Sequence, residues 1–414
     1  MTSPEAGVNA VTRDTAAQNW RMWIPCIGMA LCSWLSFVDR QVLAVLSPTI
    51  LAETGMSAQD FGNIVFFFFI AYTLANPLWG SVLDFVGLRI GMFAAVALWT
   101  AASMSHAFMS GVAGFAVARA LLGLGEGATF PGGLRTAVES LPVEKRARGI
   151  ATSFSGGTIG AIVTPLMVVP IALAYGWRTA FLLTGVLGLG WMALWFAIAR
   201  PPYLPAREQT PRKLGSPNLL ERRFWALVFS YALPVISGGP IITIFPLYLS
   251  RGLGVSQAGL GALLWMPPAA WGLGYFFWGW AADRYAATNP RPIALFLLLT
   301  ALSLTFGLAP YTNSVAATMA LMSLSIFACG GFQMVALKVG SFAYPREQAA
   351  LMTGIASGSW SLVNALVAPV IGRLFDQQRW AEAFWLVAVL PVVGVAVWMV
   401  LSRNRTTRLA TVPA

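Results

Sequence analysis

The chain has 414 residues, of which 57% are hydrophobic and 10% are charged, and its mean hydropathy is +0.71. Soluble proteins carry about 25% charged residues because their surface faces water, so this composition excludes a soluble enzyme, a nucleic-acid-binding domain and a secreted disulfide scaffold. The three cysteines (Cys26, Cys32 and Cys329) lie in apolar runs and offer no disulfide framework or metal-binding spacing. The net charge of +11 therefore indicates charged loops of an integral membrane protein.

Twelve apolar runs follow one another along the chain, and a membrane-spanning helix needs about 20 such residues to cross roughly 30 Å of hydrocarbon. They cover residues 22–46, 61–83, 90–110, 112–134, 148–173, 179–199, 224–249, 257–281, 292–311, 314–338, 350–372 and 380–401. A β-barrel would show short alternating segments instead. We therefore predict an all-α membrane protein with twelve transmembrane helices. The first run is too long for a signal peptide and no small-residue cleavage site follows it, so we expect it to be retained as an anchor.

The Lys and Arg residues are distributed unevenly between the segments that join these runs. If both termini lie inside the cell, the inward segments hold 18 of them and the outward segments hold four. This bias predicts cytoplasmic termini. The remaining four fall within spans or at span ends, and they are Arg40, Arg119, Arg135 and Lys338. Arg135 and Lys338 lie near inner ends, where long basic side chains are expected to reach the membrane interface.

The hydrophilic segment 200–223 contains five prolines and six basic residues and separates six predicted helices from the next six. We therefore predict two six-helix bundles. The predicted parts are a cytoplasmic tail (1–21), a first bundle (22–199), a cytoplasmic linker (200–223), a second bundle (224–401) and a cytoplasmic tail (402–414).

The two halves repeat several landmarks at a nearly constant offset. Gly80-x-x-x-Asp84 recurs as Gly279-x-x-x-Asp283, 199 residues later, and the pair Trp177 and Phe181 recurs 203 residues later as Trp380 and Phe384. Such coincidences indicate an internal duplication. Parallel six-helix repeats around a site at the middle of the membrane are typical of transporters.

Chief among the charged residues within the predicted spans are Asp39, Arg40, Arg119 and Glu126. A charge at the bilayer centre costs at least about 2.5–3.5 kcal/mol and usually faces a cavity or a partner. An Asp39–Arg40 ion pair is one alternative, although neighbours on a helix point about 100° apart. Arg119 and Glu126 are seven residues apart and share a helix face, so they are either an ion pair or functional groups. A glutamate in a dry cavity is a candidate proton carrier.

The segment Gly80-Ser-Val-Leu-Asp84-Phe-Val-Gly87-Leu-Arg89 resembles the signature between helices 2 and 3 of the major facilitator superfamily, and the resemblance covers essentially the whole chain. Phe37-Val-Asp39-Arg40 and the stretch from Arg119 to Pro131 resemble the organic anion:cation symporter family, and Tyr175-Gly-Trp-Arg-Thr-Ala-Phe181 is similar to its hexuronate-transporter branch. The resemblance implies a multi-pass protein of the bacterial inner membrane. It would import a small organic anion with protons by alternating access. The anion would be a sugar acid (hexuronate, aldonate or aldarate) or another carboxylate.

The resemblance also implies roles for single residues. Arg40 would bind the substrate carboxylate, Asp39 and Glu126 would carry protons, and Arg119 would serve charge balance or gating. Tyr72 aligns with a substrate-site position, with aromatic packing as its alternative. Polar side chains of the second half could hydrogen-bond substrate hydroxyls, and they are Gln333, Trp360, Ser361 and Asn364. Residues at the cytoplasmic helix ends would act as gates, and they are Gly80, Asp84, Gly87, Arg89, Asp283 and Arg284.

Some positions depart from the family pattern. Gly157 stands where relatives often carry a polar side chain that contacts sugar hydroxyls, so a less hydroxylated carboxylate is one possible substrate. The main alternative function is a proton antiporter of the same fold that exports a drug or metabolite, although Arg40 disfavours a cationic drug. One histidine, His106, and three scattered cysteines cannot form a metal site. We expect no cofactor, no enzymatic activity and no nucleic acid partner, and a monomer in the lipid bilayer.

Overall fold

The computed structural model describes residues 20–204, 218–285, 289, 291–344 and 346–403. These residues form α-helices and three short 3-10 helices, with no strand in the described ranges, which confirms the all-α prediction. Most of the predicted tails 1–21 and 402–414 and the middle of the predicted linker 200–223 lie outside the described residues.

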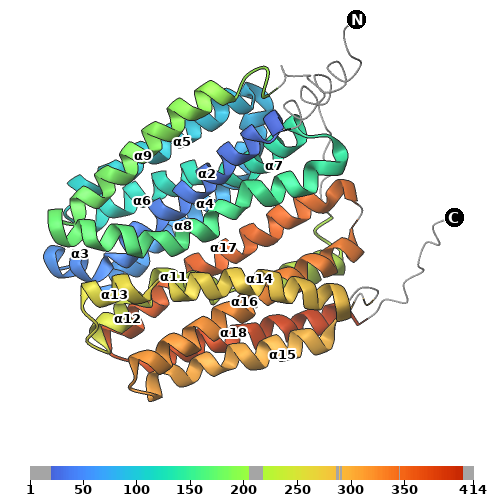
Figure 1. Cartoon of the computed structure of the whole chain (residues 1–414). Helices are drawn as coiled ribbons and strands as arrows, with labels where there is room; N and C mark the ends of the chain where they lie inside the picture. Colours follow the sequence, from blue (N-terminus) through green and yellow to red (C-terminus); the bar gives the residue numbers. More distant parts are fainter. Residues whose placement is uncertain (1–19, 205–217, 286–288, 290, 345, 404–414) are drawn as a thin grey trace, which may run out of the picture. The chain divides into compact units, whose positions relative to one another are not determined.

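The contacts between Cα atoms divide the described chain into two compact units. The first unit contains the helices of the first half together with two segments from the second half, residues 242–269 and 364–380. The second unit contains residues 213–241, 270–363 and 381–414, as far as they are described. Figure 1 shows the course of the chain through these helices. The predicted boundary between two six-helix bundles stays a prediction.

The helices of the first half follow one another with short connections. They are α2 (Ile24–Val45), α3 (Ser47–Thr54), α4 (Ala58–Val86), α5 (Leu88–Ser105), η1 (His106–Phe108), α6 (Val112–Glu126), α7 (Thr129–Ser140), η2 (Val143–Lys145), α8 (Arg146–Tyr175) and α9 (Trp177–Ile198).

In the second half, two of the predicted spans, 224–249 and 257–281, are divided into shorter pieces. The helices of this half are α10 (Arg222–Tyr231), α11 (Gly238–Thr243), α12 (Pro246–Arg251), α13 (Gln257–Leu263), α14 (Met266–Tyr285), α15 (Ile293–Leu304), η3 (Thr305–Tyr311), α16 (Val315–Ala343), α17 (Arg346–Asp376) and α18 (Trp380–Leu401).

Local sequence signals set the ends of the helix that carries Tyr72. Ser57 and Asp60 form a capping box at the start of α4, in which each side chain accepts a hydrogen bond from the other residue's backbone N–H. Gly87, with φ of +85°, separates α4 from α5, and this left-handed conformation is one that glycine adopts without a Cβ clash.

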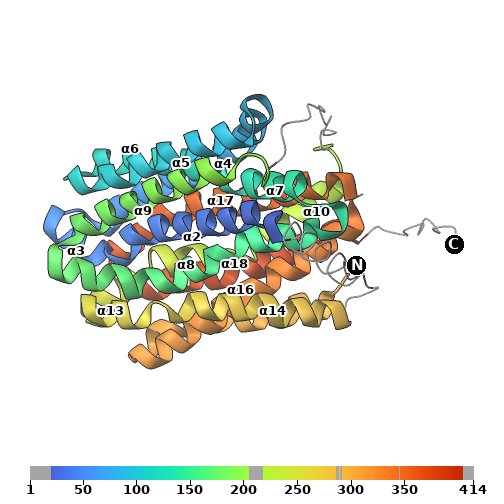
Figure 2. The same cartoon turned by 45° about the horizontal axis from the view of Figure 1, so that its top comes forward.

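Small residues let the helices around α2 and α4 approach closely, as is typical of membrane helix interfaces. Helix α2 packs along α8 (Figures 1 and 2), where a Cβ on Gly156 would overlap the carbonyl oxygen of Ala30. Helix α4 packs along α6, where a Cβ on Gly123 would overlap the carbonyl oxygen of Phe68. Glu126, at the end of α6, accepts hydrogen bonds from Ser36 and Arg40 of α2.

Eight helices of the described chain are long and apolar enough to cross a membrane, or nine if the bent pair α2 and α3 counts as one span. The other three predicted spans, 112–134, 224–249 and 257–281, are each divided between shorter helices. The count of twelve therefore stays a prediction.

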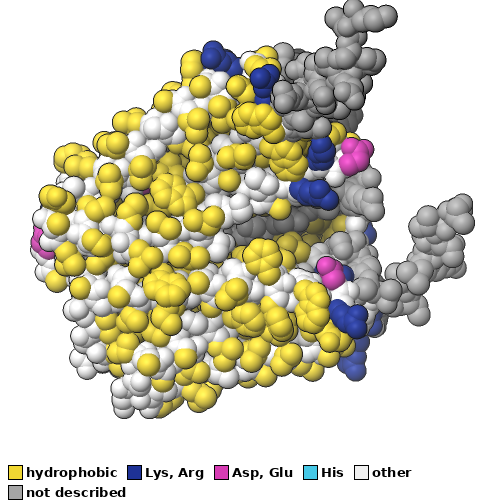
Figure 3. All heavy atoms as spheres, in the orientation of Figure 1, with side chains coloured by type: hydrophobic (Ala, Val, Ile, Leu, Met, Phe, Trp, Pro, Cys, Tyr) yellow, Lys and Arg dark blue, Asp and Glu magenta, His cyan; other side chains and the backbone are white. Residues whose placement is uncertain are grey.

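Hydrophobic side chains cover the sides of the helices in the view of Figure 3, and Lys and Arg gather at helix ends. Leu74, Val117, Phe276 and Leu297 are among the large apolar side chains that are more than half exposed. Extended exposed apolar surface is typical of a protein that contacts lipid.

Candidate functional site

Arg40 and Glu126 form an ion pair inside the first unit. Arg40 donates from Nη2 and from Nε to Glu126 Oε2, at 2.7 and 3.1 Å, and Ser36 Oγ donates to the same oxygen at 3.0 Å. Glu126 is fully buried and the Arg40 side chain is 10% exposed. The other oxygen, Oε1, has no hydrogen-bond partner among the described residues. Removing one partner of such a buried pair costs about 3–5 kcal/mol, so the two groups hold one another in place.

Neither of the two ion pairs that the sequence left open, Asp39–Arg40 and Arg119–Glu126, is formed among the described residues. Glu126 pairs with Arg40 rather than with Arg119, because seven residues along one helix separate two side chains by about 10 Å. Arg119 is buried and donates from Nη1 to the backbone carbonyl of Arg40 at 3.1 Å. Its Nε and Nη2 atoms have no partner in the described part of the chain. Arg119 therefore places a second positive charge beside the pair without neutralising Glu126 directly.

Asp39 points away from Arg40 and belongs to a separate polar cluster. Ser103 of α5 donates from Oγ to Asp39 Oδ1 at 2.6 Å, and the Ser103 hydroxyl also lies 3.1 Å from the Thr184 hydroxyl of α9. Asp39 is 1% exposed, and its Oδ2 atom has no hydrogen-bond partner among the residues that the structure describes. The two acids of the predicted proton-coupling set therefore have different partners, since Asp39 and Arg40 are neighbours on α2 and point about 100° apart.

Three aromatic rings surround the guanidinium of Arg40. Its Cζ atom lies 5.0 Å from the centres of the Phe37 and Phe68 rings and 4.9 Å from the centre of the Tyr72 ring. Cation–π contacts of this kind stabilise a guanidinium away from water. Tyr72, predicted to take part in substrate binding, is thus next to Arg40, and its ring also stacks on that of Phe68.

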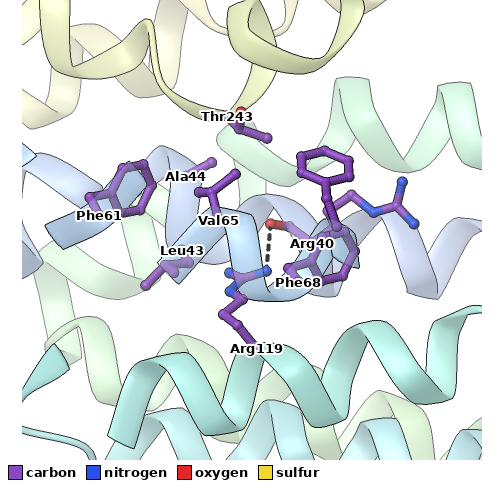
Figure 4. Close-up of a pocket in the computed structure, with 9 residues that line it drawn as sticks. Arg40, Leu43, Ala44, Phe61, Val65, Phe68, Arg119 and Thr243 are labelled. Carbon is purple, nitrogen blue, oxygen red and sulfur yellow. Dashed lines mark hydrogen bonds between the residues drawn. The ribbon is translucent and has the colours of Figure 1, made fainter. Parts of the chain in front are cut away.

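A small pocket lies next to these residues (Figure 4). In the close-up, Arg119 reaches the backbone of Arg40 from one side, and Thr243 lies on the other. The pocket has a volume of about 10 Å³, which is room for about one water molecule. Its lining consists of Arg40, Leu43, Ala44, Phe61, Val65, Phe68, Phe69, Arg119 and Thr243. A small organic anion would need more space than this pocket offers.

Two of the predicted polar residues of the second half, Gln333 and Trp360, form hydrogen bonds with other residues of the second half. Gln333 accepts a hydrogen bond from Trp271 Nε1 at 3.0 Å and donates one to the Tyr231 hydroxyl at 2.9 Å. Trp360 donates from Nε1 to the carbonyl of Val235 at 2.9 Å. Ser361 and Asn364 are buried. Gln333, Trp360 and Ser361 belong to the second unit, and Asn364 to the first. A site that joins all of these residues to Arg40 stays a prediction.

The predicted gating acids have basic partners on neighbouring helices. Asp84, at the end of α4, pairs with Arg135 Nη1 of α7 at 2.7 Å, and Arg135 also binds Glu139. In the second unit Asp283 pairs with Lys338 Nζ of α16 at 2.7 Å. The sequence predicted Arg135 and Lys338 only as interface side chains, although their shared offset of 203 residues was a signal that they correspond. The internal repeat therefore includes two corresponding ion pairs, Asp84–Arg135 in the first half and Asp283–Lys338 in the second.

The other predicted gating residues show no hydrogen bond or ion pair to these acids in the part of the chain that the structure describes. Arg89 donates from Nη2 to the carbonyl of Phe196 at 3.2 Å, and its Cζ atom lies 4.2 Å from the Phe196 ring, so it fastens α5 to α9. Arg284 is exposed. A Cβ on Gly80 would meet no atom within 4 Å, so close packing does not explain this glycine.

His106 is a packing residue in this structure. It is fully buried, its ring stacks on that of Phe181 with centres 5.0 Å apart, and Nδ1 lies 2.7 Å from the Ala102 carbonyl. In the described ranges, His, Cys, Asp and Glu side chains form no group that could hold a metal ion.

Comparisons with known proteins agree with the geometry. The family model of the Major Facilitator Superfamily matches residues 29–296 and 227–414. The chain is 25% identical to the hexuronate transporter of Escherichia coli K12 over 94% of this chain and 96% of that protein. It is 26% identical to the D-galactonate transporter of Escherichia coli O6:H1 over 94% and 97%.

Among solved structures, a bacterial homologue of the human lysosomal transporter Spinster matches with a TM-score of 0.78 at 16% identity, over 92% of this chain and 96% of that one. Each of these three proteins is named as a transporter or as the homologue of one, which agrees with the sequence prediction that this chain is not an enzyme.

Proposed function

This chain belongs to the major facilitator superfamily, and we propose that it is a proton-coupled symporter that imports a small organic anion by alternating access. The substrate is a sugar acid such as a hexuronate, aldonate or aldarate, or another carboxylate. Two relatives are named as a hexuronate transporter and a D-galactonate transporter, and these names support an organic anion as the substrate. The buried ion pair of Arg40 and Glu126 is the observation that carries the proposal.

The pair supplies a direct mechanism for coupling. While Glu126 is ionised it occupies Nε and Nη2 of Arg40. When a proton neutralises Glu126, the attraction that holds Arg40 is lost and the guanidinium is left among aromatic rings. The carboxylate of the substrate then replaces Glu126 as the partner of Arg40 and restores the charge balance. On the inner side the substrate leaves, Glu126 releases its proton and the ion pair forms again. Asp39 offers a second position for a proton.

The proposed setting is the inner membrane of a bacterium, with twelve spans in two six-helix bundles, both termini in the cytoplasm and one chain as the working unit. The Lys and Arg distribution supports this orientation. Asp84, Asp283 and their basic partners lie at the ends that would face the cytoplasm. Ion pairs at helix ends are suited to a gate, since they can form in one state and break in another.

The function is tested by uptake into proteoliposomes of purified protein. A radiolabelled organic acid is expected to accumulate when the outside is made acidic, and a protonophore is expected to abolish the accumulation. Accumulation that survives the protonophore would contradict proton coupling. Proton-driven extrusion of the acid, with no uptake under the inward gradient, would instead favour the exporting antiporter.

Contacts at the opposite helix ends support a second gate, within the first unit. Asp376, at the end of α17, accepts hydrogen bonds from the backbone N–H groups of Ala58 and Gln59, both at 2.8 Å, and lies 3.5 Å from Arg251 Nη1. Gln257 accepts a bond from Thr49 Oγ1 at 2.7 Å and donates one to the carbonyl of Val45 at 2.9 Å. Through these bonds, segments of the second half hold the end of α2 and the starts of α3 and α4, on the side that we predict to be outside.

Replacing Asp376 by alanine is expected to shift the protein toward the state in which the predicted outer side is open. The change removes a cap that contributes about 1 kcal/mol, which corresponds to a shift of roughly fivefold in an equilibrium. Val45 is 1% exposed, and in a Val45→Cys background the labelling rate with a membrane-impermeant maleimide is the measurement. Asp60→Ala is the matched control, because it weakens the capping box of the same helix without touching α17. Equal labelling of the two variants would contradict a gate at Asp376.

A further inference from the structure

We propose that the carried anion has an apolar body next to its carboxylate, such as an aromatic or cycloalkyl ring, rather than the hydroxylated body of a sugar acid. This inference rests on the proposed function, since it takes Arg40 as the group that binds the carboxylate. The proposed substrate class is narrower than organic anions in general, and it differs from the sugar acids named for the relatives. The proposal is based on the aromatic and apolar side chains around Arg40.

A carboxylate bound to Arg40 must place its neighbouring atoms against aromatic rings. The ring centres of Phe37, Phe68 and Tyr72 all lie within 5.0 Å of Arg40 Cζ. The two phenylalanine rings offer no hydrogen-bond donor or acceptor. A hydroxyl next to the carboxylate would therefore leave water without a new partner on those sides, which is unfavourable. A flat apolar ring would gain contact with the same surfaces.

The ring of Phe37 lies against Gly157 of the neighbouring helix α8. An added Cβ on Gly157 of α8 would lie 2.8 Å from Phe37 Cε2 and 2.9 Å from Cδ2, closer than real Cβ contacts. The Phe37 ring thus occupies the space that any side chain at position 157 would enter. Position 157 cannot present an amide or hydroxyl toward Arg40 while Phe37 is there. Phe37 is therefore the residue that we assign as the determinant of specificity.

The remaining surroundings of Arg40 are mainly apolar, and their polar groups are Arg119 and Thr243. Six of the nine residues that line the pocket are apolar, and they are Leu43, Ala44, Phe61, Val65, Phe68 and Phe69. In the second unit, Gln333 uses both ends of its amide in bonds to neighbouring side chains, and Trp360 uses its indole N–H in a bond to the backbone. Two of the four side chains predicted to bind hydroxyls, Gln333 and Trp360, are thus engaged in bonds within the protein itself.

Binding of three acids with equal charge and a six-membered ring tests the inference. Benzoate, cyclohexanecarboxylate and D-glucuronate are titrated into the purified protein at a mildly acidic pH that leaves all three ionised, and the affinities are taken from the rise in melting temperature. Both apolar acids are expected to bind roughly 10- to 100-fold more tightly than D-glucuronate, the range over which an apolar pocket discriminates against added hydroxyls. D-glucuronate that binds as tightly as the apolar acids, or more tightly, would overturn the inference.

Variants of Phe37 identify the determinant. Phe37→Ser is expected to lower the affinity ratio of benzoate to D-glucuronate by about tenfold, and Phe37→Leu is expected to keep it. Phe67→Ala is the matched control, since Phe67 neighbours Phe68 on α4 but is 44% exposed, and its ratio is expected to stay that of the unaltered protein. An unchanged ratio in a folded Phe37→Ser protein would overturn the assignment to Phe37.

Arg40→Ala separates this inference from the proposed function. If binding of all three acids is independent of Arg40, the proposed function fails and this inference with it. If binding depends on Arg40 but favours D-glucuronate, the proposed function stands and only the apolar substrate class is wrong.

Discussion

Replacement of Arg40 by alanine is expected to abolish substrate binding and uptake. The variant removes the only guanidinium that the described structure places among Phe37, Phe68 and Tyr72 within 5.0 Å of each ring centre. Loss of one partner from a buried, hydrogen-bonded charge pair costs about 2–5 kcal/mol of binding energy, which is a loss of affinity of roughly 30-fold or more. The measurement is binding of the transported acid to purified protein, together with uptake into proteoliposomes.

Two further variants keep this result interpretable. Arg40→Ala alone leaves Glu126 buried without its cation, which lowers the stability of the protein. The double variant Arg40→Ala with Glu126→Gln removes the unpaired charge and is expected to fold but still not to bind. Arg40→Lys keeps the charge but loses the planar fork, so it is expected to bind weakly. Uptake by the double variant at the rate of the unaltered protein would contradict the role of Arg40.

Replacement of Glu126 by glutamine is expected to separate transport from the proton gradient. Glutamine resembles the protonated acid and cannot hold Arg40 by charge. The variant is expected to exchange labelled for unlabelled substrate across the membrane and to lose accumulation driven by an acidic exterior. Because substrate binding in the unaltered protein takes up a proton, its affinity is expected to rise as the pH falls. The variant is expected to bind with nearly the same affinity across that range.

Asp39→Asn provides the comparison for this result. Asp39 bonds to Ser103 and lies apart from the Arg40–Glu126 pair. Its loss is expected to weaken proton-driven accumulation while leaving the pH dependence of binding at Arg40 in place. Pumping by Glu126→Gln at the full rate would contradict Glu126 as the coupling acid. Loss of exchange in this variant, in a protein that remains folded, would show that Glu126 is needed for the conformational change itself.

Much of the architecture could be predicted from the sequence because its causes are local. The long apolar runs, the low charge and the distribution of Lys and Arg act through transfer of each segment into lipid. They predicted an all-α membrane protein, and they made Asp39, Arg40, Arg119 and Glu126 conspicuous as charges within spans. Tyr72, proposed on resemblance alone, lies against Arg40 in the structure.

The partners of these charges could not be predicted in the same way. The sequence left an Asp39–Arg40 pair and an Arg119–Glu126 pair open, whereas Arg40 binds Glu126 and Asp39 binds Ser103. Each observed partner lies on a different helix from the residue it binds. Which side chains meet between helices depends on how close the helices pack and on the face each one turns toward the other.

The sequence by itself therefore determined which residues are charged within the membrane, since that follows from hydropathy along one segment. Only the tertiary structure decided that Glu126 neutralises Arg40, that Phe37 closes the space beside Gly157, and that Arg135 and Lys338 bind Asp84 and Asp283. The physical reason is that these contacts form between helices. Close packing at small residues such as Gly123 and Gly156 sets the position of each helix against its neighbour.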